Sequence, residues 1–163
     1  MSLSFDFSDD QNMMRDAIKT FCKEEIAPLV EEAEKTESFP QELFPKMAEM
    51  GLLGICFDEK YGGLGLDKVT QCILAEELGK TCAGIAKGVA AHVDLGSLPI
   101  AKFGTEEQKE KYLTPSIAGE IIGALAITEP NAGTDARAIK TNAVDDGDSW
   151  IMNGTKTWCS KNI

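Results

Sequence analysis

The sequence is poor in histidine, with His92 as the single one among 163 residues. Any imidazole-based metal site, and any Ser–His or Cys–His dyad, would have to be built on that one side chain. We therefore interpret His92 as a structural residue in a helical wall, and we expect no metal site. Signals of a disulfide framework are also missing, because the 5 cysteines are scattered and form no C-x-x-C pair. Such a set indicates reduced thiols in a cytoplasmic type of compartment.

Basic residues are also few, and long apolar runs are missing. Lys and Arg total 16 against 27 Asp and Glu, which gives a net charge of −11 that repels nucleic-acid phosphates and anionic membrane surfaces. The most apolar helical candidate, 82–101, is interrupted by Lys87, His92 and Asp94, so it does not suit a bilayer span. The acidic start lacks a basic and then apolar signal region. We therefore expect no nucleic-acid partner, no membrane insertion and a cytoplasmic protein.

Helix signals dominate the first 120 residues. Ser8 and Gln11 form a capping box ahead of apolar residues at helical spacing, until Pro28 kinks or ends the run. A capping box of Thr105 and Gln108 begins a shorter helix. Further helices are expected over 40–50, where the proline at position 45 is a local conflict, over 67–79, where Asp67 can cap the helix, and over 82–93. The last helix is expected to run to residue 113.

After residue 120 the pattern changes to extended segments. Strands are expected over a continuous apolar run at 121–127 and over 140–144, 149–153 and 156–160. The acidic stretch 145–148 lacks the ligand spacing and the terminal Glu of an EF-hand, so it indicates a solvated hairpin turn rather than a calcium site. We therefore predict an α+β chain, with an all-α domain over 1–120 and the first strands of a β domain over 121–163.

The first extended segment ends in a loop that a ligand can approach. Pro130 keeps Glu129 out of helical conformation, and Gly133 can take a positive φ. Thr134 adds a hydroxyl beside bare backbone amides, which together can hold a phosphate without a large side chain. The loop is therefore a candidate phosphate-binding segment.

The last extended segment carries an aromatic surface. A period of two places Lys156, Trp158 and Ser160 on one face of the expected strand. A flat indole and a hydroxyl donor on the same face suit the isoalloxazine ring of a flavin.

The two segments together resemble the flavin-binding signature of the acyl-CoA dehydrogenases. The loop Tyr61-Gly62-Gly63-Leu64-Gly65 and the segment 103–109 also resemble this family. The resemblance implies that residues 121–163 form the beginning of a truncated β-barrel domain and that the cofactor is FAD. Ser160 stands where the family usually has threonine, and Lys161 where it usually has asparagine. The implied FAD-binding residues are Ile127 and Thr128 at the pyrimidine end of the flavin, Gly133 and Thr134 near the pyrophosphate, and Trp158 and Ser160 against the ring.

The resemblance also implies an activity. The expected reaction is FAD-dependent oxidation of an acyl-CoA thioester to a trans-2-enoyl-CoA, with electrons passed to an electron-transferring flavoprotein, in a homo-oligomer of two or four subunits. The catalytic carboxylate would lie beyond residue 163, so no catalytic residue is predicted here and the chain alone is expected to be an inactive fragment. Two alternatives remain open. One is an oxygen-using flavoenzyme of the same fold, such as an acyl-CoA oxidase or a flavin monooxygenase, and the other is a non-enzymatic helical binding module.

Overall fold

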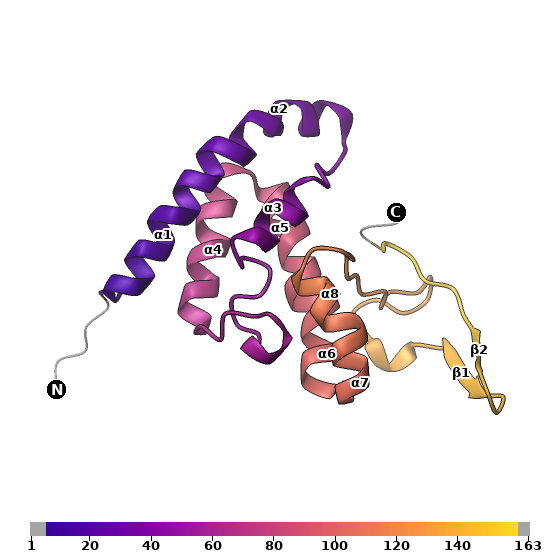
Figure 1. Ribbon diagram of the computed structural model, residues 1–163. Helices are drawn as coiled ribbons and strands as arrows, with labels where there is room; N and C mark the ends of the chain where they lie inside the picture. The colour runs from indigo at the N-terminus through magenta and orange to yellow at the C-terminus, as the bar shows by residue number, and fades with distance from the viewer. Residues whose placement is uncertain (1–5, 160–163) are drawn as a thin grey trace. The chain divides into compact units, whose positions relative to one another are not determined.

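A computed structural model of the chain describes residues 6–159, and the chain divides into two compact units between Gly123 and Ala124. The first unit is helical, and within the described residues the second contains one two-stranded sheet that is not closed into a barrel (Figure 1). This architecture confirms the predicted α+β class, with helices first and the beginning of a β domain last. Within residues 6–159, no helix is both long and apolar enough to cross a membrane.

The first helix begins as predicted but does not end at Pro28. The Ser8 hydroxyl accepts a hydrogen bond from the Gln11 amide, and the Gln11 side chain accepts one from the Ser8 amide, so the capping box is complete. Helix α1 (Asp9–Phe21) continues through a π-helical turn, η1 (Cys22–Ile26), into α2 (Ala27–Thr36). Pro28 is the second residue of α2, directly after this π-helical turn.

Pro45, the predicted local conflict, does not interrupt a helix. Pro45 lies in the first turn of α3, where the amides have no partner within the helix. The predicted conflict therefore disappears, because the helix begins at Leu43 rather than at residue 40.

The Asp67 cap of α4 is confirmed, since its carboxylate accepts a hydrogen bond from the Thr70 amide. The remaining helices are α3 (Leu43–Glu49), η2 (Glu59–Tyr61), α4 (Lys68–Thr81), α5 (Ala83–Ala90), η3 (Ala91–Ser97), α6 (Leu98–Phe103), α7 (Glu106–Gln108), η4 (Lys109–Leu113), α8 (Thr114–Ile117) and η5 (Ala136–Ala138).

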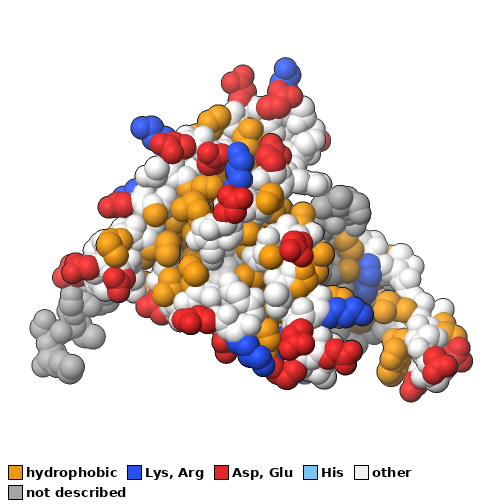
Figure 2. Space-filling model, viewed as in Figure 1, with side chains coloured by type: hydrophobic (Ala, Val, Ile, Leu, Met, Phe, Trp, Pro, Cys, Tyr) orange, Lys and Arg blue, Asp and Glu red, His pale blue; other side chains and the backbone are white. Residues whose placement is uncertain are grey.

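The core of the helical unit lies between α1, α3, α4 and α5. Its fully buried side chains include Ile18, Leu43 and Met47. Close packing against α5 requires a glycine at position 88, because a Cβ there would stand 2.3 Å from the ring of Phe39. On the face of the molecule shown in Figure 2, acidic side chains lie around a band of apolar ones.

His92 is a fully buried structural residue of η3, as its interpretation predicted. Its Nε2 lies 3.0 Å from the Ser116 carbonyl oxygen, and its Nδ1 accepts a hydrogen bond from the Gly123 amide at 2.9 Å. A carbonyl can only accept, so these partners place the ring proton on Nε2. The imidazole therefore ties α8 to the last residue of the helical unit.

Two of the four predicted strands form. Strand β1 (Asn142–Asp145) pairs antiparallel with β2 (Trp150–Asn153), with Asn142 opposite Asn153. The acidic stretch between them is the predicted hairpin turn, in which Gly147 has a φ of +81° and donates its amide to the Asp145 carboxylate.

The strand prediction over 121–127 is wrong, and no strand forms over 156–159. The apolar run begins inside the helical unit, where Ile121 donates to the Pro115 carbonyl and Gly123 donates to His92. Between the runs containing Thr128 and Thr157, one backbone hydrogen bond forms within the described residues, from the Thr157 amide to the Thr128 carbonyl. An apolar pattern predicts extended backbone, but a strand also needs a neighbour that pairs along several residues.

Candidate functional site

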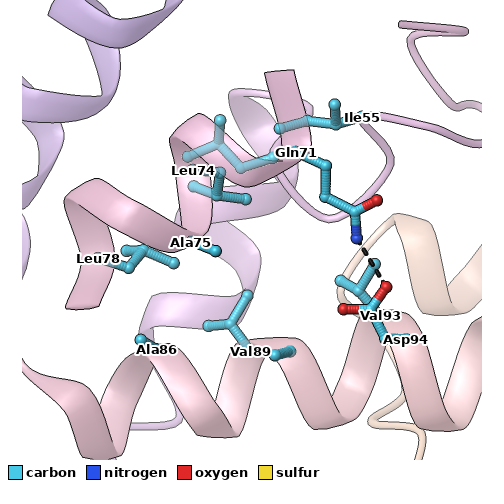
Figure 3. Close-up of a pocket in the computed structure, with 11 residues that line it drawn as sticks. Ile55, Gln71, Leu74, Ala75, Leu78, Ala86, Val89, Val93 and Asp94 are labelled. Carbon is cyan, nitrogen blue, oxygen red and sulfur yellow. Dashed lines mark hydrogen bonds between the residues drawn. The ribbon is translucent and has the colours of Figure 1, made fainter. Parts of the chain in front are cut away.

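A small pocket of the helical unit lies between α4 and the helix formed by α5 and η3 (Figure 3). Apolar side chains such as Leu74, Leu78 and Val89 line it, and its volume of ≈ 30 Å³ leaves room for a water rather than for an organic ligand. At one end, the Gln71 side-chain amide donates to the Asp94 carboxylate at 2.7 Å. Its polar groups thus satisfy each other, and we assign no chemistry to this pocket.

The second unit contains the residues predicted to bind a flavin. Five of the six are described, whereas Ser160 lies outside the described residues. No group of His, Cys, Asp and Glu side chains within residues 6–159 has an arrangement that could hold a metal ion. The candidate site is therefore built from backbone amides, hydroxyls and one indole.

A tight turn positions the predicted phosphate-binding loop. The Glu129 amide donates to the Ala132 carbonyl at 2.9 Å, and the Ala132 amide donates back to the Glu129 carbonyl at 3.1 Å. Pro130 and Asn131 form the tip of this turn, in agreement with the sequence pattern. Gly133 leaves the turn directly after the second of these hydrogen bonds.

Gly133 has an open surface and does not use the positive φ that a glycine can take. Its φ is not among the positive φ values of the described residues. A Cβ built on Gly133 would meet no atom within 4 Å, which leaves the backbone open to a ligand. The Gly133 and Thr134 amides and the Thr134 hydroxyl donate no hydrogen bond to any other part of the chain that the structure describes. These donors fit a phosphate group.

The carboxylate of Glu129 is the centre of the unit's hydrogen-bond network. The side chain is buried, and its Oε1 accepts from the Thr141 amide, the Thr141 hydroxyl and Lys156 Nζ, while Oε2 accepts from the Lys140 amide. The hydroxyl of Thr141, then the Lys140 amide, Lys156 and the Thr141 amide lower the pKa of Glu129 to about 2. We refer to Glu129, Lys140, Thr141 and Lys156 as the Glu129 network.

The sequence did not reveal this network. Glu129 appeared as part of a turn, and Lys156 as a partner of Trp158 on a strand face. In the structure, Lys156 Nζ contacts Glu129 Oε1 at 2.9 Å and the Ile127 carbonyl at 2.8 Å. In the sequence, an acid before a proline is only a weak signal of such a role. The separation of 27 residues between Lys156 and Glu129 gives no local pattern to detect.

The two parts of the predicted site lie side by side in the second unit. The Thr157 amide donates to the Thr128 carbonyl at 2.8 Å, directly after the Lys156 contact with Ile127. Trp158 has a φ of +57°, so the expected period of two stops there and Lys156 does not share a strand face with it. The indole of Trp158 is 91% exposed, which leaves its flat surface uncovered by the described residues.

Ile127 is half-exposed and Thr128 is partly buried in the same segment. Their carbonyl groups are used by Lys156 and Thr157, whereas their amides donate no hydrogen bond within residues 6–159. The segment thus presents free amide donors at positions 127 and 128, free donors at 133 and 134, and an uncovered aromatic surface. This combination fits a ligand that has a planar ring, hydrogen-bond acceptors and phosphates, as FAD does.

Comparison with known proteins decides the family. Residues 8–120 match the N-terminal domain of acyl-CoA dehydrogenases, and residues 124–162 match their middle domain. The chain belongs to the acyl-CoA dehydrogenase family. The resemblance carried by the two sequence segments is thereby confirmed.

Individual members of the acyl-CoA dehydrogenase family are similar over most of this chain. A probable acyl-CoA dehydrogenase of Bacillus subtilis is 44% identical, covering 96% of this chain and 41% of that protein. A chain in the structure of the electron transferring flavoprotein of Acidaminococcus fermentans gives a TM-score of 0.90 at 45% identity, covering 94% of this chain and 40% of that one. An acyl-CoA dehydrogenase of Bacillus anthracis complexed with FAD gives a TM-score of 0.87 at 40% identity, covering 94% and 27%. The chain spans about two fifths of the length of the curated relatives it matches.

Proposed function

We propose that the protein is an FAD-dependent acyl-CoA dehydrogenase that oxidises an acyl-CoA thioester to a trans-2-enoyl-CoA. The observation that carries this proposal is the pairing of two features in one unit of a chain from this family. Within residues 6–159, the loop 127–134 offers unused amide and hydroxyl donors, and the segment 156–158 beside it offers an uncovered indole. Family membership supports the reaction class, and the relative from Bacillus anthracis is a complex with FAD.

The residues of this chain would bind and orient the cofactor. The amides at Ile127 and Thr128 would donate to the pyrimidine end of the ring, where negative charge increases on reduction. Gly133 and Thr134 would donate to the pyrophosphate, and Trp158 would cover one side of the ring. Bound FAD would supply the acceptor for the hydride that leaves the β-carbon of the substrate. A hydrogen bond from Ser160 to the ring stays a prediction, since this residue lies outside the described residues.

The other half of the reaction is removal of the α-proton of the thioester. This proton is too weakly acidic for a carboxylate in water, so the site must desolvate the base and stabilise the developing charge on the thioester oxygen. We assign this base to no residue of the chain. Glu129 does not suit the role, because a carboxylate with a pKa of about 2 is a weak base at neutral pH.

The proposed electron acceptor is an electron-transferring flavoprotein. The similar chain in the electron transferring flavoprotein structure from Acidaminococcus fermentans supports this partner. We further propose that the whole protein works in the cytoplasm as a homodimer or homotetramer. The net charge of −11 favours small-molecule and protein partners over nucleic acid.

The test of this proposal is an anaerobic reduction experiment on the whole purified protein. We expect a yellow protein whose flavin absorption bleaches when an acyl-CoA is added, and whose colour returns with an electron-transferring flavoprotein faster than with air. Rapid reoxidation by air with release of peroxide would instead identify an oxidase. A protein that is purified without flavin, and that cannot be reconstituted with FAD, would refute the proposal and favour a binding module.

A further inference from the structure

We propose that Glu129 is a positioning residue for the cofactor loop, which orders residues 127–134 and 156–158 without itself contacting FAD. This inference rests on the proposed function, because it gives the loop a flavin to hold. It concerns the second unit alone.

The Glu129 carboxylate already uses most of its hydrogen-bonding capacity on the chain itself. Four hydrogen-bond donors from three residues point to its two oxygens: the Lys140 amide, the Thr141 amide and hydroxyl, and Lys156 Nζ. The Glu129 side chain is also buried, with a residue exposure of 8%. A side chain in this state organises its surroundings rather than binding solutes.

Glu129 and its partner Lys156 also link the two segments of the proposed flavin site. Glu129 follows Thr128 directly, and it fixes Lys156, whose Nζ also contacts the Ile127 carbonyl at 2.8 Å. The next residue, Thr157, donates its amide to the Thr128 carbonyl. Peptide planes are rigid, so fixing the Ile127 carbonyl also fixes the Thr128 amide, which is one of the two proposed ring donors. One carboxylate thereby joins the segment that carries the proposed ring donors to the segment that carries Trp158.

Thr141 is also packed closely against the backbone of Gly154. A Cβ built on Gly154 would lie 2.1 Å from Thr141 Oγ1, so glycine at position 154 is what allows this approach. Thr141 therefore lies between the Gly154 backbone and the Glu129 carboxylate. Its hydroxyl and amide both donate to Oε1 of Glu129, at 2.5 Å and 2.9 Å.

The charge of the network also suits a positioning role. Lys156 and Glu129 form an ion pair, so their charges compensate each other inside the unit. The pKa of Glu129, about 2, keeps the carboxylate ionised across the pH range in which enzymes work. A positioning carboxylate should therefore give no titration in the dependence of FAD affinity on pH between about 5 and 9, whereas a carboxylate that exchanges protons with a ligand would give one.

The test compares three variants of the whole protein with wild type. Glu129→Gln replaces one oxygen that accepts hydrogen bonds with an NH2 group that donates them, so at least one donor of the Glu129 network loses its acceptor. Thr141→Val keeps the shape of the side chain and removes only the hydroxyl. Asp148→Asn, in the exposed hairpin turn, removes one negative charge from the same unit and is the matched control.

Two measurements are made on each variant. Hydrogen exchange of the FAD-free protein reports whether the amides of Lys140, Thr141 and Thr157 stay protected. Titration with FAD gives its dissociation constant, and circular dichroism confirms that the helical unit is folded. We expect Glu129→Gln to raise both the exchange rate of these amides and the FAD dissociation constant by about tenfold or more. Thr141→Val should raise the exchange rate and the dissociation constant by less. Asp148→Asn should leave the exchange rate and the dissociation constant unchanged.

The outcomes distinguish the positioning role of Glu129 from the proposed FAD-dependent function. Unchanged exchange and unchanged FAD affinity in Glu129→Gln would overturn the positioning role. Increased exchange with unchanged FAD affinity would also overturn it, because the ordering would then not serve the cofactor. If Glu129→Gln is not folded, Thr141→Val provides the same comparison. A wild-type protein that binds no FAD, with a protected Glu129 network, would refute the proposed function and with it the cofactor role, while showing that the ordering itself exists.

Discussion

The Tyr61 hydroxyl donates a hydrogen bond to Glu106 Oε2 at 2.7 Å, across 45 residues of sequence. Tyr61 belongs to the glycine-containing loop that resembles the acyl-CoA dehydrogenases, and Glu106 stands in the first turn of α7. Lys60 contacts the same carboxylate oxygen. The loop is therefore attached to the end of the helical unit by a side-chain contact that no local pattern predicts.

Tyr61→Phe tests this attachment. The ring stays buried while the hydroxyl is lost, so we expect the free energy of unfolding to fall by about 0.5–1.5 kcal/mol. Urea unfolding followed by circular dichroism measures the change. Tyr112→Phe is the matched control, because that ring is 41% exposed and should lose almost nothing. Equal effects of the two variants would contradict the role given to the Tyr61–Glu106 contact.

His92→Ala should destabilise the helical unit strongly. The substitution leaves a cavity and removes the partners of the Ser116 carbonyl and the Gly123 amide, so we expect a loss of about 2–4 kcal/mol. Thermal or urea unfolding gives the value. Phe103→Ala, at a side chain that is 85% exposed, should stay within about 0.5 kcal/mol of wild type. A small effect at His92 would show that the imidazole is not the link between α8 and residue 123.

The two tryptophans of the chain should respond differently to FAD. Trp158 and Trp150 are both exposed, at 91% and 67%, but only Trp158 stands beside the proposed donors. In the whole protein, Trp158→Ala should weaken FAD binding by about tenfold and shift the flavin absorption band, because a stacked aromatic surface is lost. Trp150→Ala should change neither. If Trp150→Ala has the larger effect, the assignment of the ring site to Trp158 is wrong.

Gly133→Ala separates ligand binding from folding. The added Cβ meets no protein atom within 4 Å, and the φ at Gly133 is not in the left-handed region, so the unfolding transition should be unchanged. The dissociation constant of FAD should nevertheless rise, by about tenfold, if the pyrophosphate lies against this backbone. Unchanged affinity for FAD, measured by the same titration, would exclude Gly133 from the site.

Acid should weaken the contacts made by Glu106 and Glu129 as the pH falls from about 4.5 to about 2. The pKa of Glu106 is lowered to about 2 by hydrogen bonds from Lys60 and Tyr61, and that of Glu129 to about 2 by the Glu129 network, against an ordinary value of 4.5. A lowered pKa means that the stabilisation is fully present above about pH 4.5 and is lost as the pH falls through about 2. Unfolding measured from pH 5 to pH 2 should show this loss, and Glu129→Gln should show less of it. A variant with the wild-type pH dependence would contradict the assignment.

The sequence by itself determined the features that depend on neighbours along the chain. The capping boxes at Ser8 and Thr105 and the Asp67 cap form as predicted, because each uses donors within three residues of its acceptor. The hairpin turn at 145–148 forms for the same reason. The family could also be read from two segments near the end of the chain, since its motifs are continuous in sequence.

Tertiary structure decided what depends on residues far apart. The run 121–127 is as apolar as a strand, but amides near its beginning donate hydrogen bonds to the Pro115 carbonyl and to the His92 ring. The apolar pattern could not show that this run would not pair with a neighbouring strand. Gly133 can take a positive φ and does not. Glu129 and Lys156 are 27 residues apart, and their ion pair exists only because the turn at 129–132 and the segment at 156–157 meet. Periodicity constrains the direction of the backbone over a few residues, whereas the pairing of distant polar groups is fixed only when the packed chain removes them from water.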